Sequence, residues 1–209
     1  MIDAVRALNR LREGNRHFVS SLAEGGVLSR PARRTDPDAG QEPFAIILGC
    51  SDSRVPAELV FDQGFGDLFV IRVAGNIVAP SQVGSVEFAA SRFHTRLVVV
   101  MGHTQCGAVI AALEELQGKA ADDSANLRSI VERVRPSVES VFSSHRDDDP
   151  EALIHAAVRA NVRVSTDHLR HGSALLERLI QSNGLVVVGA EYSLETGVVD
   201  FFEGVPAGA

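Results

Sequence analysis

One stretch of this sequence decides how the chain folds: residues 97–107, which read LVVVMGHTQCG. Its first five residues are apolar without alternation, a pattern typical of a strand buried on both faces of a parallel sheet. Residues 44–50, FAIILGC, have the same character, and similar runs occur at 68–73 and 185–189. Segments with helical periodicity separate these runs. The pattern therefore predicts an α/β fold with a central, mainly parallel sheet flanked by helices.

The expected helices follow from apolar residues spaced by three and four positions. The first lies within residues 1–22, where Asp3 would cap its start. Four more are expected at 82–94, 107–116, 125–135 and 151–181. The third of these should stop before Pro136, and Gly172 could kink or divide the last one. Residues 192–202 read as a hairpin, whose second strand would add a C-terminal antiparallel strand to about four parallel ones.

Length and composition are those of an ordinary globular domain, with 209 residues, 45% hydrophobic and 22% charged. We expect a single domain over residues 1–209. It would consist of the N-terminal helix at 1–22, a connecting segment at 23–42 that is rich in Gly, Pro and Arg, and an α/β core at 43–209.

The net charge of −7 argues against a nucleic-acid partner, because no basic stripe could neutralise phosphates. No apolar stretch is long enough to cross a bilayer. The first six residues lack the basic-then-apolar layout of a signal peptide. Two cysteines without disulfide-rich spacing fit a reducing compartment, so we expect a cytoplasmic protein with no membrane partner.

The only two cysteines, Cys50 and Cys106, each follow an apolar run, and His103 precedes the second by three positions. The carboxyl ends of parallel strands are where ligand sites form. Two thiolates and one imidazole suit zinc and leave a fourth position open, as in catalytic sites. Cys106 would also feel the positive end of the following helix, which favours its thiolate. A lone buried cysteine such as Cys50, or a lone His-x-x-Cys such as His103–Cys106, is more often structural. The two together favour a metal site.

Asp52 and Arg54 follow Cys50 at alternate positions. If the backbone stays extended, the thiol, the carboxylate and the guanidinium point to the same side. The simpler interpretation of Asp52 and Arg54 is a salt bridge at a strand end. Beside a metal, Asp52 could also fill the fourth position, which would change a catalytic site into a closed one.

These motifs resemble those of the β-class carbonic anhydrases, at CSDSR (50–54), FVIRVAGN (69–76) and GHTQCGA (102–108). The similarity extends over nearly the whole chain. It implies one zinc ion per subunit, held by Cys50, His103 and Cys106. It also implies reversible hydration of carbon dioxide to bicarbonate and a proton, by a zinc-bound hydroxide that the Asp52–Arg54 dyad orients.

The resemblance assigns a substrate pocket as well. Gln41 matches a glutamine that hydrogen-bonds substrate in the plant-like branch of the family, although on its own it reads as a polar linker residue. Phe69, Ala74 and Phe88 match positions that line the apolar pocket for carbon dioxide, and by composition they are ordinary core residues. The Gly107 backbone N–H, at a helix start, could help to hold a substrate oxygen.

Another branch of the family closes its site with bicarbonate, using a tryptophan, an arginine and a tyrosine. This chain has Ile47 and Phe88 at the tryptophan and tyrosine positions, so only Arg72 remains. We therefore expect the plant-like branch, with an open site at neutral pH, while Asp52 could become a fourth ligand at lower pH. The resemblance also implies a homodimer or homotetramer, with the N-terminal helix reaching over a dimer partner.

Three alternatives remain. The same scaffold and metal could hydrolyse carbonyl sulfide or carbon disulfide, and no visible motif distinguishes that activity. A non-enzymatic regulator that binds zinc or bicarbonate is disfavoured, because a structural site needs neither Gln41 nor the Asp52–Arg54 pair. A nucleotide-binding α/β protein is disfavoured because no glycine-rich loop of the required spacing follows a strand.

Overall fold

The computed structural model describes residues 2–24, 40–119, 124–144 and 149–208. A five-stranded sheet lies at its centre, in the order β2-β1-β3-β4-β5. The strands are β1 (Ala45–Gly49), β2 (Leu68–Arg72), β3 (Leu97–His103), β4 (Val186–Tyr192) and β5 (Val199–Glu203). The first four run parallel, and β5 runs antiparallel to β4. The predicted α/β fold with a mainly parallel sheet is confirmed.

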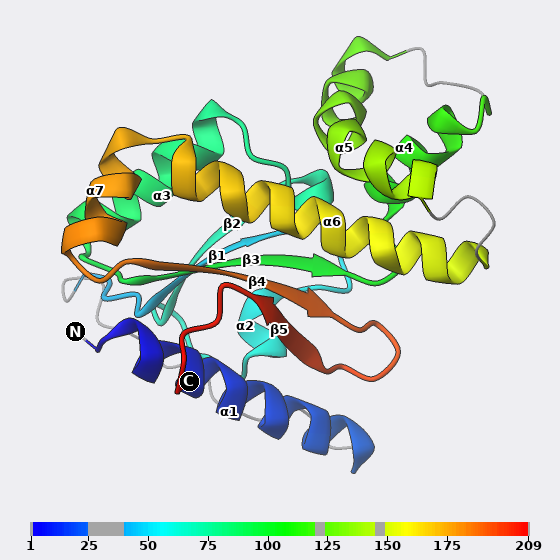
Figure 1. Ribbon diagram of the computed structural model, residues 1–209. Helices are drawn as coiled ribbons and strands as arrows, with labels where there is room; N and C mark the ends of the chain where they lie inside the picture. The colour runs from blue at the N-terminus through cyan, green and yellow to red at the C-terminus, as the bar shows by residue number, and fades with distance from the viewer. Residues whose placement is uncertain (1, 25–39, 120–123, 145–148, 209) are drawn as a thin grey trace.

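Helices cover both faces of the sheet (Figure 1). On one face lies α1 (Ala4–Ala23), with the short α2 (Ala57–Val60) beside it. On the other face lie α3 (Pro80–Arg92), α6 (Pro150–His171) and α7 (Ala174–Ser182). Beyond the carboxyl ends of the strands, α4 (Gly107–Leu116) and α5 (Ala125–Ser144) project from the body of the molecule. A 3₁₀ turn, η2 (Ala74–Asn76), follows β2.

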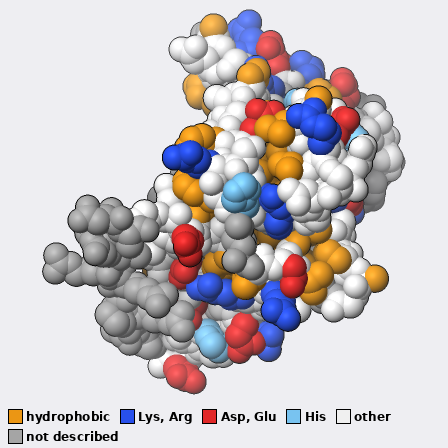
Figure 2. Space-filling view, turned by 90° about the vertical axis from the view of Figure 1, so that its left-hand side faces the viewer, with side chains coloured by type: hydrophobic (Ala, Val, Ile, Leu, Met, Phe, Trp, Pro, Cys, Tyr) orange, Lys and Arg blue, Asp and Glu red, His pale blue; other side chains and the backbone are white. Residues whose placement is uncertain are grey.

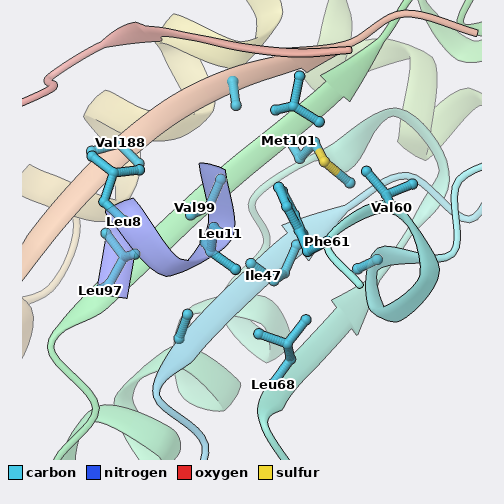
Figure 3. Packing of buried hydrophobic residues seen from close by; sticks show 14 of the residues in the cluster. Leu8, Leu11, Ile47, Val60, Phe61, Leu68, Leu97, Val99, Met101 and Val188 are labelled. Carbon is cyan, nitrogen blue, oxygen red and sulfur yellow. The ribbon is translucent and has the colours of Figure 1, made fainter. Parts of the chain in front are cut away.

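The N-terminal helix packs on its own chain. Asp3 caps α1 as predicted, since its side chain accepts a hydrogen bond from the Arg6 N–H at 2.8 Å. Leu8 and Leu11 are fully buried in one cluster with residues of β1 and β3 (Figure 3). Burying such a side chain contributes about 1.5–3 kcal/mol each. The expectation that α1 also reaches over a partner stays a prediction.

The prediction that a helix stops before Pro136 is wrong, because α5 continues through this proline to Ser144. A proline removes one helical hydrogen bond, and its ring crowds the preceding turn. Here Val134 and Val138, on either side of it, are both fully buried in a cluster with residues of α4 and α6. Packing of these valines outweighs the local cost of the proline.

Gly172 divides the long helical segment, as the sequence suggested. The Gly172 N–H closes α6 with a hydrogen bond to the His168 carbonyl at 2.7 Å. Ser173 then caps α7, because its side chain accepts a hydrogen bond from the Leu176 N–H. A side chain at position 172 would collide with the His168 carbonyl, so the division depends on glycine.

Most of the expected connection at 23–42 lies outside the described residues. None of the helices in the described part of the chain is long and apolar enough to cross a membrane. On the face shown in Figure 2, acidic and basic side chains are interspersed among hydrophobic ones, over the described atoms drawn there.

Candidate metal centre

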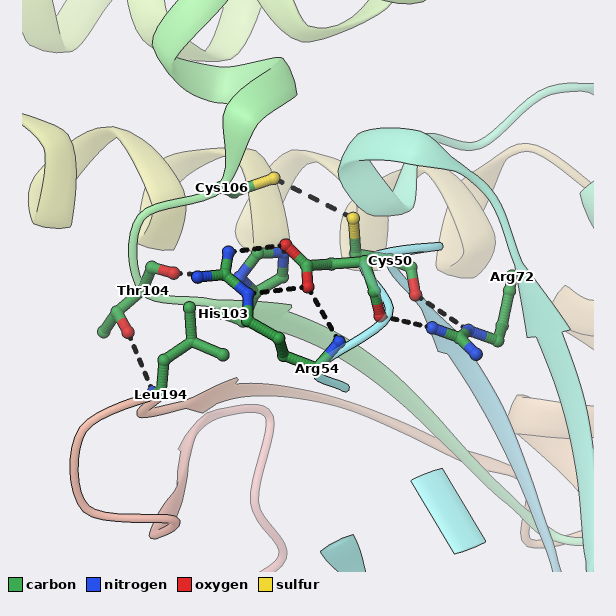
Figure 4. A network of polar contacts seen from close by, with 8 residues as sticks. Cys50, Arg54, Arg72, His103, Thr104, Cys106 and Leu194 are labelled. Carbon is green, nitrogen blue, oxygen red and sulfur yellow. Dashed lines mark hydrogen bonds and ion pairs between the residues drawn. The ribbon is translucent and has the colours of Figure 1, made fainter. Parts of the chain in front are cut away.

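Three ligand atoms from two strand ends meet at the carboxyl edge of the sheet. Cys50 follows β1, His103 is the last residue of β3, and Cys106 is the N-cap of α4. The two Sγ atoms lie 4.0 Å apart, and the ligand atoms of all three residues lie within 4.8 Å of one another. Their exposed fractions are 6%, 0% and 1% in the same order. Figure 4 shows the two sulfur atoms facing each other.

His103 leaves one ring nitrogen available for a metal. Its Nδ1 lies 2.8 Å from the Thr104 carbonyl, which can only accept, so Nδ1 carries the proton. Its Nε2 is buried and has no hydrogen-bond partner among the described residues. A buried nitrogen lone pair without a partner is costly, and here it faces two thiols. This donor set of two sulfurs and one imidazole fits a zinc ion.

The neighbours of Cys50 favour its thiolate. The hydrogen bond with Cys106 lowers the pKa of the Cys50 thiol most strongly; burial opposes this effect, and the neighbouring His103 side chain adds to it. The nearby backbone at Asp52 and Gly75 acts in the same direction, so the pKa of the Cys50 thiol lies well below its usual value. The same sulfur–sulfur bond raises the pKa of the Cys106 thiol. The thiolate is therefore favoured at Cys50, and a cation bound by both sulfurs would require Cys106 to lose its proton as well.

Asp52 and Arg54 form a two-point ion pair beside the three ligands. Arg54 Nη2 lies 2.7 Å from Asp52 Oδ2, and Arg54 Nε donates to Asp52 Oδ1 at 3.0 Å. This hydrogen bonding by Arg54 holds the pKa of the Asp52 carboxyl well below its usual range. Asp52 Oδ2 lies 3.9 Å from His103 Nε2. An ionised carboxylate thus stands next to the ligand cluster.

The backbone does not stay extended from Cys50 to Arg54, so that expectation is wrong. The chain turns after Asp52, whose carbonyl accepts a hydrogen bond from the Val55 N–H at 3.0 Å. The Asp52 side chain also accepts from the Arg54 N–H at 2.9 Å, as aspartate side chains often do in turns. The pair meets through this turn rather than through strand alternation.

Arg72 belongs to this site, although sequence reasoning placed it only in the missing bicarbonate trap. It ends β2 and pairs in register with Gly49, the residue before Cys50. Its Nε donates to the Cys50 carbonyl at 3.0 Å, and its Nη2 donates to the Asp52 carbonyl (Figure 4). The expected parallel pairing of two strand ends is the signal that could have identified it.

Two of the predicted substrate residues lie near the cluster. Ala74 opens η2, and Ile77, the C-cap residue of this turn, is buried in one cluster with Cys50 and Cys106. Gly107 is the first residue of α4, directly after Cys106. Both therefore lie at the carboxyl edge of the sheet.

The other three predicted substrate residues lie away from the cluster within one chain. Phe69 pairs with Ile46, four residues before Cys50, which corresponds to about 13 Å along the strand. Phe88 packs against Phe69 with ring centroids 6.2 Å apart, and 53% of it is exposed. Gln41 is exposed and precedes β1, at the end opposite to Cys50.

Residues 45–199 match the family model of carbonic anhydrase. The chain belongs to the carbonic anhydrase family. A relative from Mycobacterium tuberculosis, "Carbonic anhydrase 2", is 38% identical over 200 residues, which are 92% of this chain and 90% of the relative. A carbonic anhydrase of Mycolicibacterium smegmatis is 36% identical over 200 residues, covering 94% and 92% of the two chains.

Solved β-carbonic anhydrases share the fold of this carbonic anhydrase. The β-carbonic anhydrase CafA of Aspergillus fumigatus matches with a TM-score of 0.73 and 25% identity, over 81% of this chain and 80% of that one. A β-carbonic anhydrase of Sordaria macrospora, described as tetrameric, matches with a TM-score of 0.69 and 22% identity, over 91% and 93% of the chains. The expected membership of the β class is confirmed, and the family supports hydration of carbon dioxide as the reaction.

Proposed function

We propose that this carbonic anhydrase hydrates carbon dioxide reversibly at a single zinc ion per subunit, held by Cys50, His103 and Cys106. The observation that carries the proposal is the buried His103 Nε2, which lacks a partner among the described residues and faces two thiols. A zinc ion in this donor set would lower the pKa of a coordinated water towards about 7 and so supply a nucleophile at neutral pH.

Asp52 would orient the attacking oxygen. An ionised carboxylate only accepts hydrogen bonds, so Asp52 would accept one from the O–H group of the nucleophile. A lone pair of the nucleophilic oxygen would then be directed at carbon dioxide. Arg54 holds both carboxylate oxygens, which fixes the direction of this acceptor. This ion pair also disfavours Asp52 as a metal ligand, because Asp52 would have to give up its two contacts with Arg54 to bind the metal. We therefore propose an open site at neutral pH.

Two further groups would act on the substrate. The Gly107 N–H lies in the first turn of α4, where N–H groups have no partner within the helix and the helix dipole favours negative charge. It would hold an oxygen on which charge develops as carbon dioxide becomes bicarbonate. Ala74 would contribute apolar surface beside the reacting carbon.

The functional unit proposed is a homodimer or homotetramer in the cytoplasm. In it, Gln41, Phe69 and Phe88 of one copy would line the metal centre of another, since within one chain they lie towards the opposite end of β1 and β2. The tetrameric description of the Sordaria macrospora enzyme supports an assembly of this kind.

Stopped-flow measurement of carbon dioxide hydration, with zinc content determined on the same sample, tests the proposal. We expect rapid hydration and one zinc per chain, with both lost in Cys50→Ser. A Cys50→Ser protein that loses zinc yet hydrates carbon dioxide at the full rate would overturn the metal assignment. A parallel assay of sulfide release from carbonyl sulfide separates the alternative: fast release with negligible hydration would replace the proposed substrate.

A further inference from the structure

The turn between β2 and α3 has a backbone conformation that needs support. Gly75 and Asn76 are consecutive residues with positive φ, at 69° and 43°. A left-handed conformation costs a non-glycine residue about 1–2 kcal/mol. Such a turn persists when the surrounding structure holds it in place. The support comes from α6, which lies on the same face of the sheet as α3 (Figure 1).

Two side chains of α6 hold two successive carbonyls of this turn. Asn161 Nδ2 donates to the Gly75 carbonyl at 2.8 Å, and Ser165 Oγ donates to the Asn76 carbonyl at 3.1 Å. These two residues are four positions apart and therefore share one face of the helix. Both are buried, with exposed fractions of 2% and 4%. Solvent therefore cannot easily replace either bond.

Asn161 also lies against a third element, α5. Its Oδ1 lies 3.3 Å from the hydroxyl of Ser137, a buried residue of α5 that is 1% exposed. The single hydroxyl proton of Ser137 also faces the Val134 carbonyl at 2.6 Å, so it does not determine how Asn161 is oriented. The Gly75 carbonyl does, because it can only accept and therefore faces the NH₂ group of Asn161. Because Asn161 is buried, water cannot easily take its place at the Gly75 carbonyl.

The same turn lies against the metal ligands. A side chain at position 75 would meet the Ala108 Cβ at 3.0 Å, and Ala108 lies two residues after Cys106. Ile77, at the end of the turn, is buried in one cluster with both cysteines. The turn whose carbonyl Asn161 binds therefore packs against both cysteines.

We propose that Asn161 is a positioning residue for the metal centre: by fixing the carbonyl of Gly75, it holds the turn that packs against Cys50 and Cys106. This inference rests on the proposed function, since it concerns the same zinc ligands. Loss of Asn161 leaves a buried carbonyl without this donor and frees the turn to relax away from the two cysteines. Partners of metal ligands typically change metal affinity by about 10- to 100-fold when they are removed.

The test is the zinc dissociation constant of Asn161→Ala, measured by competition with a chelator of known affinity. We expect the constant to rise about tenfold or more. Cobalt substitution provides a second readout, because the thiolate-to-cobalt absorption band reports the geometry at Cys50. That band should shift or weaken in the variant.

Thr166→Ala is the matched control. Thr166 is also buried in α6, but its hydroxyl donates to the Val162 carbonyl of the same helix, so its loss leaves the turn untouched. We expect its zinc constant and cobalt spectrum to equal those of the unmodified chain. An Asn161→Ala protein that matches this control in both readouts overturns the inference and leaves a purely structural asparagine.

Two other variants decide the matter if Asn161→Ala does not fold. Asn161→Ser keeps a shorter donor, and Ser165→Ala frees the next carbonyl of the turn. Zinc binding that is weaker in either of these variants than in Thr166→Ala supports the inference. Zinc binding equal to that of Thr166→Ala in both variants overturns it. If the unmodified chain binds no zinc, the proposed function fails and the inference with it. If the unmodified chain binds zinc and hydrates carbon dioxide, only the inference is at stake.

Discussion

Arg72 and Cys50 are joined across two neighbouring strand ends, with Arg72 Nε donating to the Cys50 carbonyl at 3.0 Å. A second bond from the same guanidinium reaches the Asp52 carbonyl. One side chain thus fixes the backbone of a metal ligand and of the neighbouring carboxylate. A planar guanidinium can span both carbonyls, which the single ammonium of a lysine does less well.

Replacing this guanidinium should lower activity more than zinc content. In Arg72→Met the Cys50–Asp52 backbone loses both donors, and we expect kcat/KM for carbon dioxide hydration to fall about tenfold. Arg72→Lys, which keeps the charge, should have an intermediate rate. Stopped-flow rates and zinc content measured together give the answer. If Arg72→Met hydrates carbon dioxide as fast as the unmodified chain, the two hydrogen bonds from Arg72 to the Cys50 and Asp52 carbonyls are not needed for activity.

Asp52→Asn should retain zinc and lose most of its activity. The amide has nearly the same shape but places an NH₂ group where an acceptor is needed. A positioned group that handles a proton typically contributes about 10²–10⁴ in rate, so we expect a loss of at least about 100-fold in kcat. Zinc content should stay at one per chain. Undiminished kcat would remove Asp52 from the mechanism.

The ion pair of Asp52 and Arg54 predicts a particular dependence of stability on pH. The pKa of Asp52 is lowered in the folded chain, so the contribution of the pair is fully present above the pKa of an unfolded aspartate, about 3.9. It is lost as the pH falls through the lower pKa of the folded state. In Arg54→Met this contribution should disappear at every pH above about 4. Urea unfolding of both proteins between about pH 3 and pH 7 tests the sign, and a difference that grows towards low pH would contradict it.

Pro136→Ala should stabilise the protein. Because α5 continues through this position, alanine restores a hydrogen bond and removes ring crowding. Proline costs about 3 kcal/mol in a helix interior, and we expect part of this, at least about 1 kcal/mol, to be recovered. The melting temperature should rise by about 2–4 °C for each kcal/mol. A decrease would mean that the proline ring is needed for packing.

Much of the fold was predictable because it depends on local pattern. The unalternating apolar runs ending at Cys50 and at Met101 can be buried only in a sheet covered on both faces, and parallel strands bring their carboxyl ends together. That convergence is why the sequence alone predicts Cys50, His103 and Cys106 as one cluster.

The remainder depends on contacts between distant segments, which a local pattern does not contain. The helix passes Pro136 because two flanking valines are buried by other helices, not because of its own sequence. The hydrogen bond from Asn161 to the Gly75 carbonyl joins residues 86 positions apart. Whether Phe69 and Phe88 line a metal centre depends on where a second copy lies, which no single-chain pattern describes.

The separation of the two thiols along the chain has one further consequence. Cys50 and Cys106 are 56 residues apart, yet their sulfurs are neighbours. An ion bound to both would join two segments that β2 and α3 separate along the chain, and it would bind the folded chain, in which the ligands meet, rather than the unfolded one. The ion would act as a reversible cross-link, stabilising the chain further as its free concentration rises above the dissociation constant. Metal supply would thus govern the lifetime of the folded enzyme as well as its rate.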